Sequence, residues 1–376
     1  MKTIGEIGMP RKYRIAVLPG DGVSREVIPE AVKALKAAQE AVTGLKLDFI
    51  EFECGFEYYK KTGKPWSPEA FQACKESDAI LYGAVGLPGV EGLEHIVYVH
   101  RILRSDLDLY ANIRPVKLRE NVDCPLAGKK PVDIDFVIVR ENTEDLYAPI
   151  RGVLTRAGTD EVAIDVKIVT RKGAERIIKY AFELCKKRGK GAPLDGKLRV
   201  TCVDKSTVLK SCAFFRQVYN EVAEGYPDIE KDYALIDAWT QWALKRPEYY
   251  DVVVTTNLFG DLISEMGAQI QGGLGIAPSA EVGDEHGMFR PIHGSVPKYY
   301  GKKVANPMAA ILSAKMLMEW LAERHNDKSA GEAADRIEKA VDQTLREGKA
   351  LTQDLGGSSK THEVGDAVAN KIRKIR

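Results

Sequence analysis

A run of β-branched residues, Val252-Val253-Val254-Thr255-Thr256, is the feature that most constrains the fold of this chain. A run that is apolar on both faces is typical of a parallel strand covered by helices on both sides. The helix-like segment that follows carries Asp261 and Glu265, four residues apart. Two carboxylates with that spacing share one helix face, where they repel each other unless a cation lies between them. The pattern predicts either a solvated acidic helix face or oxygen ligands for Mg²⁺ or Mn²⁺.

Composition excludes several classes of protein. The 376 residues, of which 44% are hydrophobic, suffice for about two domains. A net charge of +1 gives no reason to expect nucleic acid or an anionic membrane as a partner. No apolar run approaches the roughly 18 residues of a membrane span, and the segment Met1 to Arg14 lacks the apolar core of a signal peptide. Six dispersed cysteines without a C-x-x-C pair favour reduced thiols, so we expect a cytoplasmic protein.

Strand-like and helix-like segments alternate along the chain, which predicts an α/β fold. The predicted strands are residues 13–18, 48–52, 79–82, 135–139, 166–169, 198–203, 234–237 and 251–256. The predicted helices start at Val23, at Ser67 as an N-cap, at Arg171, at Asn257 and at Asn306-Pro307, with one more at the carboxyl terminus. Glycine-rich loops at residues 20–22 and 83–89 follow strands, where open α/β sheets bind ligands. The first loop is not a dinucleotide fingerprint, and a tight turn explains it equally well.

Several arginines have the chemistry to bind carboxylates: Arg101, Arg104, Arg114 and Arg140. The first two are three residues apart and share a helix face, and Arg140 ends a predicted strand. A guanidinium group matches a carboxylate with two parallel hydrogen bonds. If three of them converge, the substrate is a small di- or tricarboxylate, and if they do not, each is a surface ion pair.

A set of motifs in fixed order resembles the β-decarboxylating dehydrogenases, the family of isocitrate, homoisocitrate and 3-isopropylmalate dehydrogenases. The motifs are Gly20-Asp21-Gly22, Leu103-Arg104 with Asp108 to Pro115, Arg140 to Tyr147, Asp204-Lys205, Asn257 to Glu265, His293-Gly294-Ser295, Asn306-Pro307 and Asp354 to Gly357. The resemblance implies a two-domain α/β fold with a mixed sheet and an active site in the cleft between the domains. A discontinuous cofactor-binding domain would comprise residues 1–109 and 272–376, without a Rossmann fold. A central domain, residues 110–271, would hold the metal and catalytic residues and the dimer interface.

The resemblance also implies a role for each motif residue. The carboxylates of the substrate would bind Arg104, Arg114 and Arg140, with Tyr147 as the acid and Lys205 as the base. Mg²⁺ or Mn²⁺ would bind Asp237, Asp261 and Glu265. Because Lys205 and Asp237 would reach the site from the partner subunit, the protein would be a homodimer with shared active sites, or a higher oligomer. The dinucleotide would contact a last group of residues: His293, Gly294, Ser295, Lys298, Tyr299 and Asn306.

Some positions depart from the family pattern. Glu265 replaces an aspartate, Arg290 replaces a glutamate and Thr207 replaces an asparagine. At Lys298, NAD-preferring members carry an aspartate that binds the adenosine ribose. A cation there can pair with a 2′-phosphate, so NADP is expected, with NAD as the alternative.

The substrate is ranked by the same resemblance. The segment from Arg140 to Tyr147 looks most like isocitrate dehydrogenases, so isocitrate, converted to 2-oxoglutarate with NADP, ranks first. Homoisocitrate-type enzymes can use an arginine at the position of Arg101 to bind a third carboxylate. Homoisocitrate therefore ranks second, ahead of 3-isopropylmalate and D-malate or tartrate. A different class of function is a non-catalytic regulatory subunit. The presence of Tyr147, Lys205 and Asp261 favours an enzyme.

Overall fold

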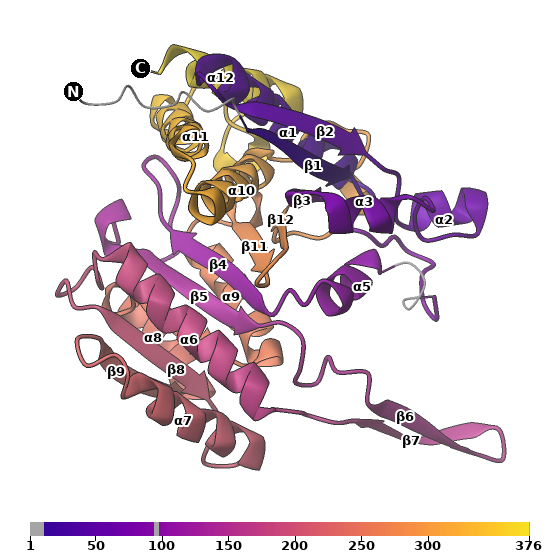
Figure 1. Cartoon of the computed structure of the whole chain (residues 1–376), viewed down its shortest axis with the longest axis vertical. Coiled ribbons are helices and arrows are strands. Elements are labelled where there is room, and N and C mark those ends of the chain that lie inside the picture. The colour runs from indigo at the N-terminus through magenta and orange to yellow at the C-terminus, as the bar shows by residue number, and fades with distance from the viewer. Residues whose placement is uncertain (1–10, 94–97, 376) are drawn as a thin grey trace, which may run out of the picture. The chain divides into compact units, whose positions relative to one another are not determined.

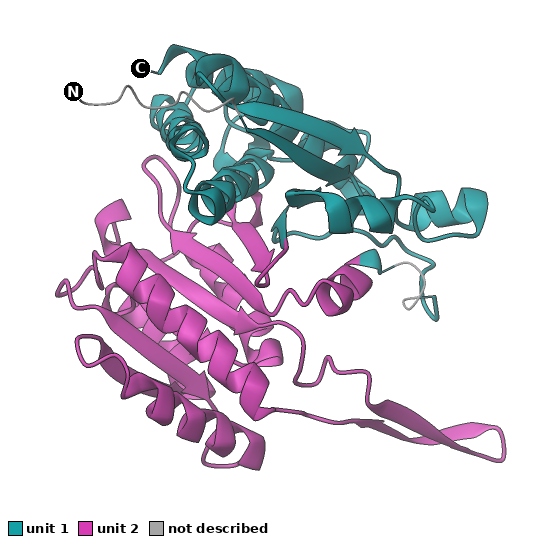
Figure 2. Cartoon of the chain, in the orientation of Figure 1, with its two compact units in different colours: residues 1–99, 287–376 teal, residues 100–286 magenta. Residues whose placement is uncertain are grey.

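The computed structural model describes residues 11–93 and 98–375, and it divides the chain into two compact units (Figure 2). The terminal unit combines residues 1–99 with residues 287–376. The central unit is the segment between them, residues 100–286. Residues 100–109 and 272–286 therefore lie in the central unit, whereas the sequence assigned them to the discontinuous domain.

The terminal unit is built on parallel strands (Figure 1). Their order is β2 (Lys46–Glu51), β1 (Lys12–Leu18), β3 (Ala79–Tyr82) and β12 (Gly287–Pro291). Its helices are α1 (Ser24–Ala41), α2 (Phe56–Thr62), α3 (Ala70–Glu76), α10 (Met308–His325), α11 (Lys328–Glu347) and α12 (Thr361–Lys374). The central helix α10 is apolar around most of its circumference because it packs against α1, α11 and β12. Across residues 11–93 and 98–375, no helix is both long enough and apolar enough to cross a membrane.

The central unit holds a mixed sheet with helices on both faces (Figure 1). The strand order is β11 (Pro278–Val282), β4 (Ala111–Lys117), β5 (Asp135–Glu141), β10 (Val252–Thr255), β8 (Arg199–Asp204) and β9 (Glu230–Leu235). β4 runs antiparallel to both β11 and β5, and the remaining neighbours are parallel. Helices α6 (Arg171–Arg188) and α7 (Lys210–Ala223) cover one face, and α8 (Ile236–Lys245) and α9 (Asn257–Ile270) cover the other. The short helix α5 (Val99–Asp106) precedes β4. The sequence-based prediction of a mixed α/β fold is confirmed.

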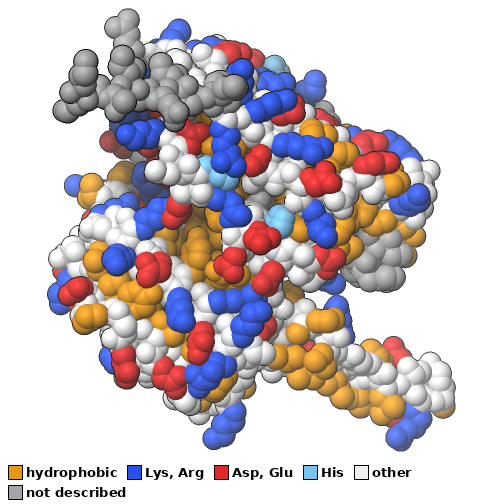
Figure 3. All heavy atoms as spheres, viewed as in Figure 1, with side chains coloured by type: hydrophobic (Ala, Val, Ile, Leu, Met, Phe, Trp, Pro, Cys, Tyr) orange, Lys and Arg blue, Asp and Glu red, His pale blue; other side chains and the backbone are white. Residues whose placement is uncertain are grey.

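A two-stranded arm extends from the central unit (Figures 1 and 3). It consists of β6 (Arg151–Arg156) and β7 (Thr159–Asp165), joined by a two-residue turn in which Ala157 and Gly158 both have positive φ. That turn suits the twist of a hairpin. Every residue of both strands is exposed, including apolar side chains such as Leu154 and Ile164. An isolated hairpin with both faces exposed is only marginally stable in water.

Three local predictions are wrong. Residues 166–169 form no strand: β7 ends at Asp165, and only a single bridge joins Ile168 to Asp145. Asp237 does not end a strand, because β9 stops at Leu235 and Asp237 lies in the first turn of α8, where a carboxylate is favoured. Helix α3 starts at Ala70, and the carbonyl of Ser67, not its hydroxyl, accepts the first amide hydrogen bond.

Candidate active site

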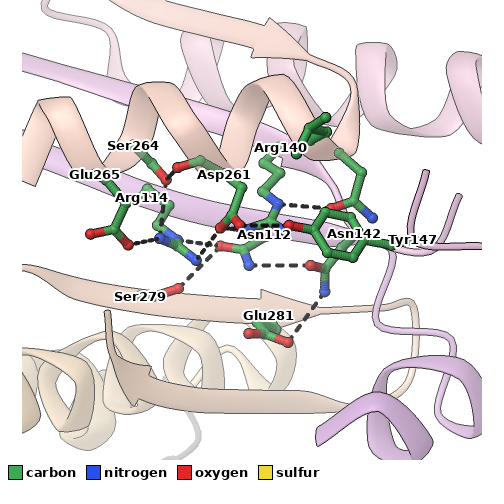
Figure 4. A network of polar contacts seen from close by, with 12 residues as sticks. Asn112, Arg114, Arg140, Asn142, Tyr147, Asp261, Ser264, Glu265, Ser279 and Glu281 are labelled. Atoms are coloured by element: carbon green, nitrogen blue, oxygen red, sulfur yellow. Dashed lines mark hydrogen bonds and ion pairs between the residues drawn. The ribbon is translucent and has the colours of Figure 1, made fainter. Parts of the chain in front are cut away.

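One row of residues across neighbouring strands positions the candidate site. Glu281 on β11 pairs in register with Asn112 on β4, and Asn112 pairs with Arg140 on β5. Residues paired in register point to the same face of a sheet, and so does Arg114, two residues after Asn112. Helix α9 lies over this face and brings Asp261 against the row (Figure 4).

Arg140 is held by the first turns of α9. Its Nε donates to the Asn257 Oδ1 at 2.9 Å, and its Nη1 forms an ion pair with the Asp261 carboxylate. A Cβ on Gly260 would lie 2.5 Å from the Arg140 Cγ, so only glycine lets the helix approach this closely. Arg140 is 2% exposed, and a charge buried to that extent needs a counterion.

Asp261 receives hydrogen bonds on both carboxylate oxygens. Arg140 contacts Oδ1, and the Tyr147 hydroxyl donates to Oδ2 at 2.8 Å. Burial opposes ionisation of Asp261, but Arg140, Arg114 and the Tyr147 hydroxyl more than offset it and hold the pKa of this carboxyl below its usual range. Burial and the neighbouring Asp261 carboxylate raise the pKa of the Tyr147 phenol. At neutral pH the pair is therefore a carboxylate beside a protonated phenol.

The Arg114 guanidinium lies between the two acidic residues of α9. Its Nη2 is 3.8 Å from Asp261, and its Nη1 is 3.6 Å from Glu265. Two neutral partners fix its orientation: Nε donates to Asn112 Oδ1 at 3.0 Å and Nη1 donates to Ser264 Oγ at 3.0 Å. The sequence left a solvated acidic face and a metal site as alternatives for these two acids, and in this structure the Arg114 guanidinium lies beside both carboxylates.

Arg104 forms a bidentate ion pair with Glu281. Nε and Nη2 of Arg104 lie 2.6 and 2.7 Å from the two carboxylate oxygens. Asn142 donates to the same carboxylate at 3.2 Å and accepts from Asn112 at 3.2 Å, which links the pair to the strand row. Arg101, one turn before Arg104 on α5, is exposed. No local sequence pattern assigned a role to Asn112 or Glu281, because the register between β11, β4 and β5 places them here.

The loop that carries Tyr147 is fixed by a buried ion pair. Asp145, 1% exposed and with φ of 68°, accepts from the amide of Leu258 at 2.9 Å and pairs with the Lys167 ammonium. Lys167 also donates to Thr256 at 3.1 Å and lies 4.9 Å from the ring centroid of Phe259. Thr256, Leu258 and Phe259 all lie at the start of α9. The Asp145–Lys167 ion pair therefore sets the position of Tyr147 relative to Asp261.

Replacing Lys167 with methionine should lower the free energy of unfolding by about 3 kcal/mol, because Asp145 would be left buried without a cation. It should also reduce kcat more than it raises KM, since the loop that carries the Tyr147 phenol is no longer held by the Asp145–Lys167 ion pair. Urea unfolding with steady-state kinetics measures both. Lys190→Met is the matched control: Lys190 pairs with Asp135 at an exposed position, so the change should cost less than about 1 kcal/mol. Equal losses in the two variants would contradict the positioning role.

Lys205 and Asp237 form a second group. Lys205 follows β8, which is separated from β5 by β10, and its Nζ lies 2.8 Å from the Asp237 Oδ1. This hydrogen bond lowers the pKa of the Asp237 carboxyl. The described residues include no group of three or more His, Cys, Asp and Glu side chains arranged to hold a metal. Asp237 is therefore not joined to Asp261 and Glu265 in a ligand set within one chain.

The terminal unit brings part of the predicted dinucleotide-binding residues together. Ser295 donates to the carbonyl of Gly86, and its own carbonyl accepts from the amide of Val23 at 2.8 Å. Burial lowers the pKa of His293, whose Nδ1 lies 2.9 Å from the Gly294 carbonyl, so the ring is neutral with its proton on Nδ1. The two glycine loops and the His293 loop thus form one backbone junction.

The loop at residues 20–22 is a structural turn. The fully buried Asp21 carboxylate accepts backbone amide hydrogen bonds from Phe56, Glu57 and Gly86, at 2.8, 3.1 and 2.8 Å. It thus fills the place that an anion would take at the start of α2. The loop forms a tight turn, and anion binding at the start of α1 stays a prediction.

The remaining cofactor candidates lie farther along the terminal unit. Lys298 and Lys302 flank the exposed ring of Tyr299, with Nζ atoms 5.7 and 5.5 Å from its centroid. Asn306 accepts a hydrogen bond from the amide of Met308, the first residue of α10, at 3.0 Å and donates to Asp354 at 3.0 Å. Nothing in the structure explains why Arg290 replaces the glutamate of the family pattern.

The two-unit α/β fold, whose central sheet carries the cluster of acid, carboxylates and guanidinium groups on one face, is that of the β-decarboxylating oxidoreductases. The family model described as isocitrate/isopropylmalate dehydrogenase matches residues 14–368. The chain belongs to this family, which confirms the resemblance in its sequence.

Several relatives match over almost their full length. A 3-isopropylmalate/3-methylmalate dehydrogenase of Methanocaldococcus jannaschii is 42% identical over 96% of this chain and 99% of its own. A homoisocitrate dehydrogenase of the same organism is 38% identical over 96% of this chain and 98% of its own. The crystal structure of isocitrate dehydrogenase from Methylococcus capsulatus superposes with a TM-score of 0.85 and 33% identity, over 96% of this chain and 99% of that chain. These relatives carry different substrate names.

Proposed function

We propose that the chain is a metal- and dinucleotide-dependent enzyme that oxidises and decarboxylates a 3-substituted malate. The supporting observation is the contact of the Tyr147 phenol, the Asp261 carboxylate and the Arg140 guanidinium on one face of the sheet. The phenol supplies an acid, the carboxylate a metal ligand and the guanidinium a partner for a substrate carboxylate. A regulatory subunit would not need this combination.

The protein groups divide the work of proton transfer. Tyr147 keeps its proton at neutral pH, so it can donate to the carbon that loses carbon dioxide. Lys205 would accept the proton of the substrate hydroxyl as hydride leaves for the nicotinamide. Arg114 and Arg140, both nearly fully buried, hold the substrate carboxylates in a fixed orientation.

A hard divalent cation fits the donor set of α9. Asp261 supplies a carboxylate held ionised by its neighbours, and Glu265 supplies a second one that is 49% exposed. When bound, Mg²⁺ or Mn²⁺ polarises the substrate oxygens and stabilises negative charge on them. Asp237 of the partner subunit would complete the ligands that one chain lacks.

We infer a homodimer because the central unit exposes apolar surface that a second copy could cover. The arm exposes Val153, Leu154 and Ile164, and Trp242 on α8 and Leu262 on α9 are also exposed. Exposed apolar patches of this kind mark interfaces. Within one chain, Lys205 and Asp237 form a group apart from Asp261. This arrangement agrees with shared active sites, in which Lys205 and Asp237 enter from the partner. A cytoplasmic location agrees with six free cysteines, five of them buried.

NADP is the proposed dinucleotide, because two ammonium groups beside the exposed Tyr299 ring suit a phosphate. Lys298→Asp should lower kcat/KM for NADP by about 30-fold and leave that for NAD within about threefold, since only NADP has the 2′-phosphate to repel. Initial rates with both dinucleotides measure the ratio. Lys339→Asp, the same charge change on the exposed side of α11, is the control. Unchanged preference in the Lys298 variant would argue against this site.

A panel of 2-hydroxy acids with Mn²⁺ and either dinucleotide tests the proposed function. The panel comprises isocitrate, homoisocitrate, 3-isopropylmalate, 3-methylmalate, D-malate and tartrate, followed by reduced nicotinamide absorbance. Isocitrate is favoured by the segment from Arg140 to Tyr147, and the 3-alkylmalates by the 42%-identical relative. Turnover of at least one acid is expected. A folded protein that binds these acids without turnover would instead be a regulatory subunit.

A further inference from the structure

The ion pair between Arg104 and Glu281 is a fixed part of the site. Glu281 is fully buried and the Arg104 side chain is 13% exposed. Both carboxylate oxygens contact the guanidinium, and Asn142 adds a third hydrogen bond. An ionised carboxylate buried to this extent stays with its partner, because separation would leave a buried charge without compensation.

Glu281 changes the charge that a substrate meets. Three guanidinium groups, Arg104, Arg114 and Arg140, stand beside three carboxylates, Asp261, Glu265 and Glu281. The group is therefore formally neutral, and a divalent metal would make it doubly positive. Arg104 also influences the pKa values of Asp261 and Tyr147, so its pair belongs to the same electrostatic environment. Without the Glu281 charge, the site would carry one more positive charge.

We infer that Glu281 restricts the substrate to dianionic 3-substituted malates, whose substituent at carbon three has no charge. This inference rests on the proposed function. A doubly positive site balances two carboxylates, and a third carboxylate would approach an arginine whose charge Glu281 already neutralises. Arg101 does not supply the positive charge that a third carboxylate needs, because its side chain is exposed and water and salt screen its charge. The inference places 3-methylmalate and 3-isopropylmalate ahead of isocitrate and homoisocitrate.

Glu281→Gln tests the inference by removing the charge while keeping the shape and a hydrogen-bond acceptor. Relative to wild type, kcat/KM for isocitrate divided by that for 3-isopropylmalate should rise at least about tenfold, mainly through KM. Glu281→Asp keeps the charge and should leave the ratio within about threefold. An unchanged ratio in the glutamine variant would overturn the inference, as would a wild-type enzyme that prefers isocitrate.

A second measurement on the wild type covers a glutamine variant that does not fold. Methylsuccinate, a dianion, should inhibit wild type more strongly than tricarballylate, the trianion with one more carboxylate on the same three-carbon skeleton. Stronger inhibition by tricarballylate overturns the inference. Asp251→Asn is the stability control, because the Asp251–Arg188 pair has the same side-chain exposures as the Glu281–Arg104 pair. Asp251 directly precedes β10, at the opposite end of that strand from the site. It should destabilise the protein without moving the substrate ratio. If wild type turns over neither acid class, the proposed function itself fails, and the inference with it.

Discussion

Asparagine in place of Asp261 should lower kcat/KM by about 10³-fold with Mn²⁺, the larger of the single-residue effects expected in this enzyme. Asparagine has the size of aspartate and keeps one carbonyl oxygen, but it has no charge. The carboxylate of Asp261 serves three groups at once: it would bind the metal, it balances Arg140, and it accepts the Tyr147 hydroxyl. Arg140 would then keep a charge at 2% exposure with its nearest counterion removed.

Three measurements separate these effects. Steady-state kinetics gives the loss of turnover, isothermal titration with Mn²⁺ gives metal affinity, and urea unfolding gives stability. Glu265→Gln is the control, because Glu265 is half exposed and lies 3.6 Å from Arg114, so we expect its loss to stay within about tenfold. Full activity of the Asp261 variant, or of wild type treated with EDTA, would contradict the metal role.

The pH dependence of stability gives an independent check on Asp261. Its pKa is lower in the folded state than in the unfolded chain, so the folded state binds the proton less readily. The stabilisation this provides is complete above the unfolded pKa of about 4 and is lost as pH falls through the folded pKa. The difference in unfolding free energy between wild type and Asp261→Asn should therefore shrink below about pH 4.

The sequence pattern predicted that Arg140 ends a strand, the family resemblance supplied the roles of Tyr147 and Asp261, and the convergence of the arginines was left open. The β5 and β10 strands are parallel neighbours, with Arg140 and Thr255 paired in register, so the segments after them meet at one edge. Local pattern identifies such strand ends, but the pairing of β5 with β10 is what brings them together. Strand pattern likewise placed Lys205 directly after the segment that forms β8.

Glu281 could not be found in this way. It reaches the site because β11 runs antiparallel to β4 and pairs with it at Asn112, and neither the pairing nor its register can be read from a local segment. A single glutamate in an otherwise apolar stretch carries no signal of its partner, Arg104, which lies in a helix 177 residues away. Long-range register therefore decides the charge of the site.

The arm and Asp237 show a second limit of pattern reading. Period-two alternation identifies a strand because one face is buried, but both faces of β6 and β7 are exposed. The predicted strand at 166–169 therefore lies wholly after β7, which ends at Asp165. For Asp237, the apolar run before it continues into α8, and a strand-to-helix junction without a loop leaves no turn residue to mark it.

Mixing two inactive variants, Tyr147→Phe and Lys205→Met, should restore activity to about a quarter of the wild-type value. Each variant alone should lose at least about 10²-fold in kcat, since each lacks one proton-transfer group. In a symmetric dimer with shared sites, a hybrid has one site with both replacements and one site with neither. Random exchange makes about half of the dimers hybrids, and half of their sites are intact.

The outcome discriminates between shared and self-contained sites because Lys205 and Asp237 pair with each other, apart from Tyr147 and Asp261. If each chain used its own lysine, every site in the mixture would lack one group and no activity would return. Subunit exchange is verified with tagged chains, and a mixture of Tyr147→Phe with Asp261→Asn is the control, because both replacements lie in the same group. That mixture should stay inactive, since neither site of its hybrid is complete. Rescue by the control mixture would contradict the assignment of Tyr147 and Asp261 to one site of one chain. No rescue with Lys205→Met after verified exchange would show that Lys205 acts within its own chain.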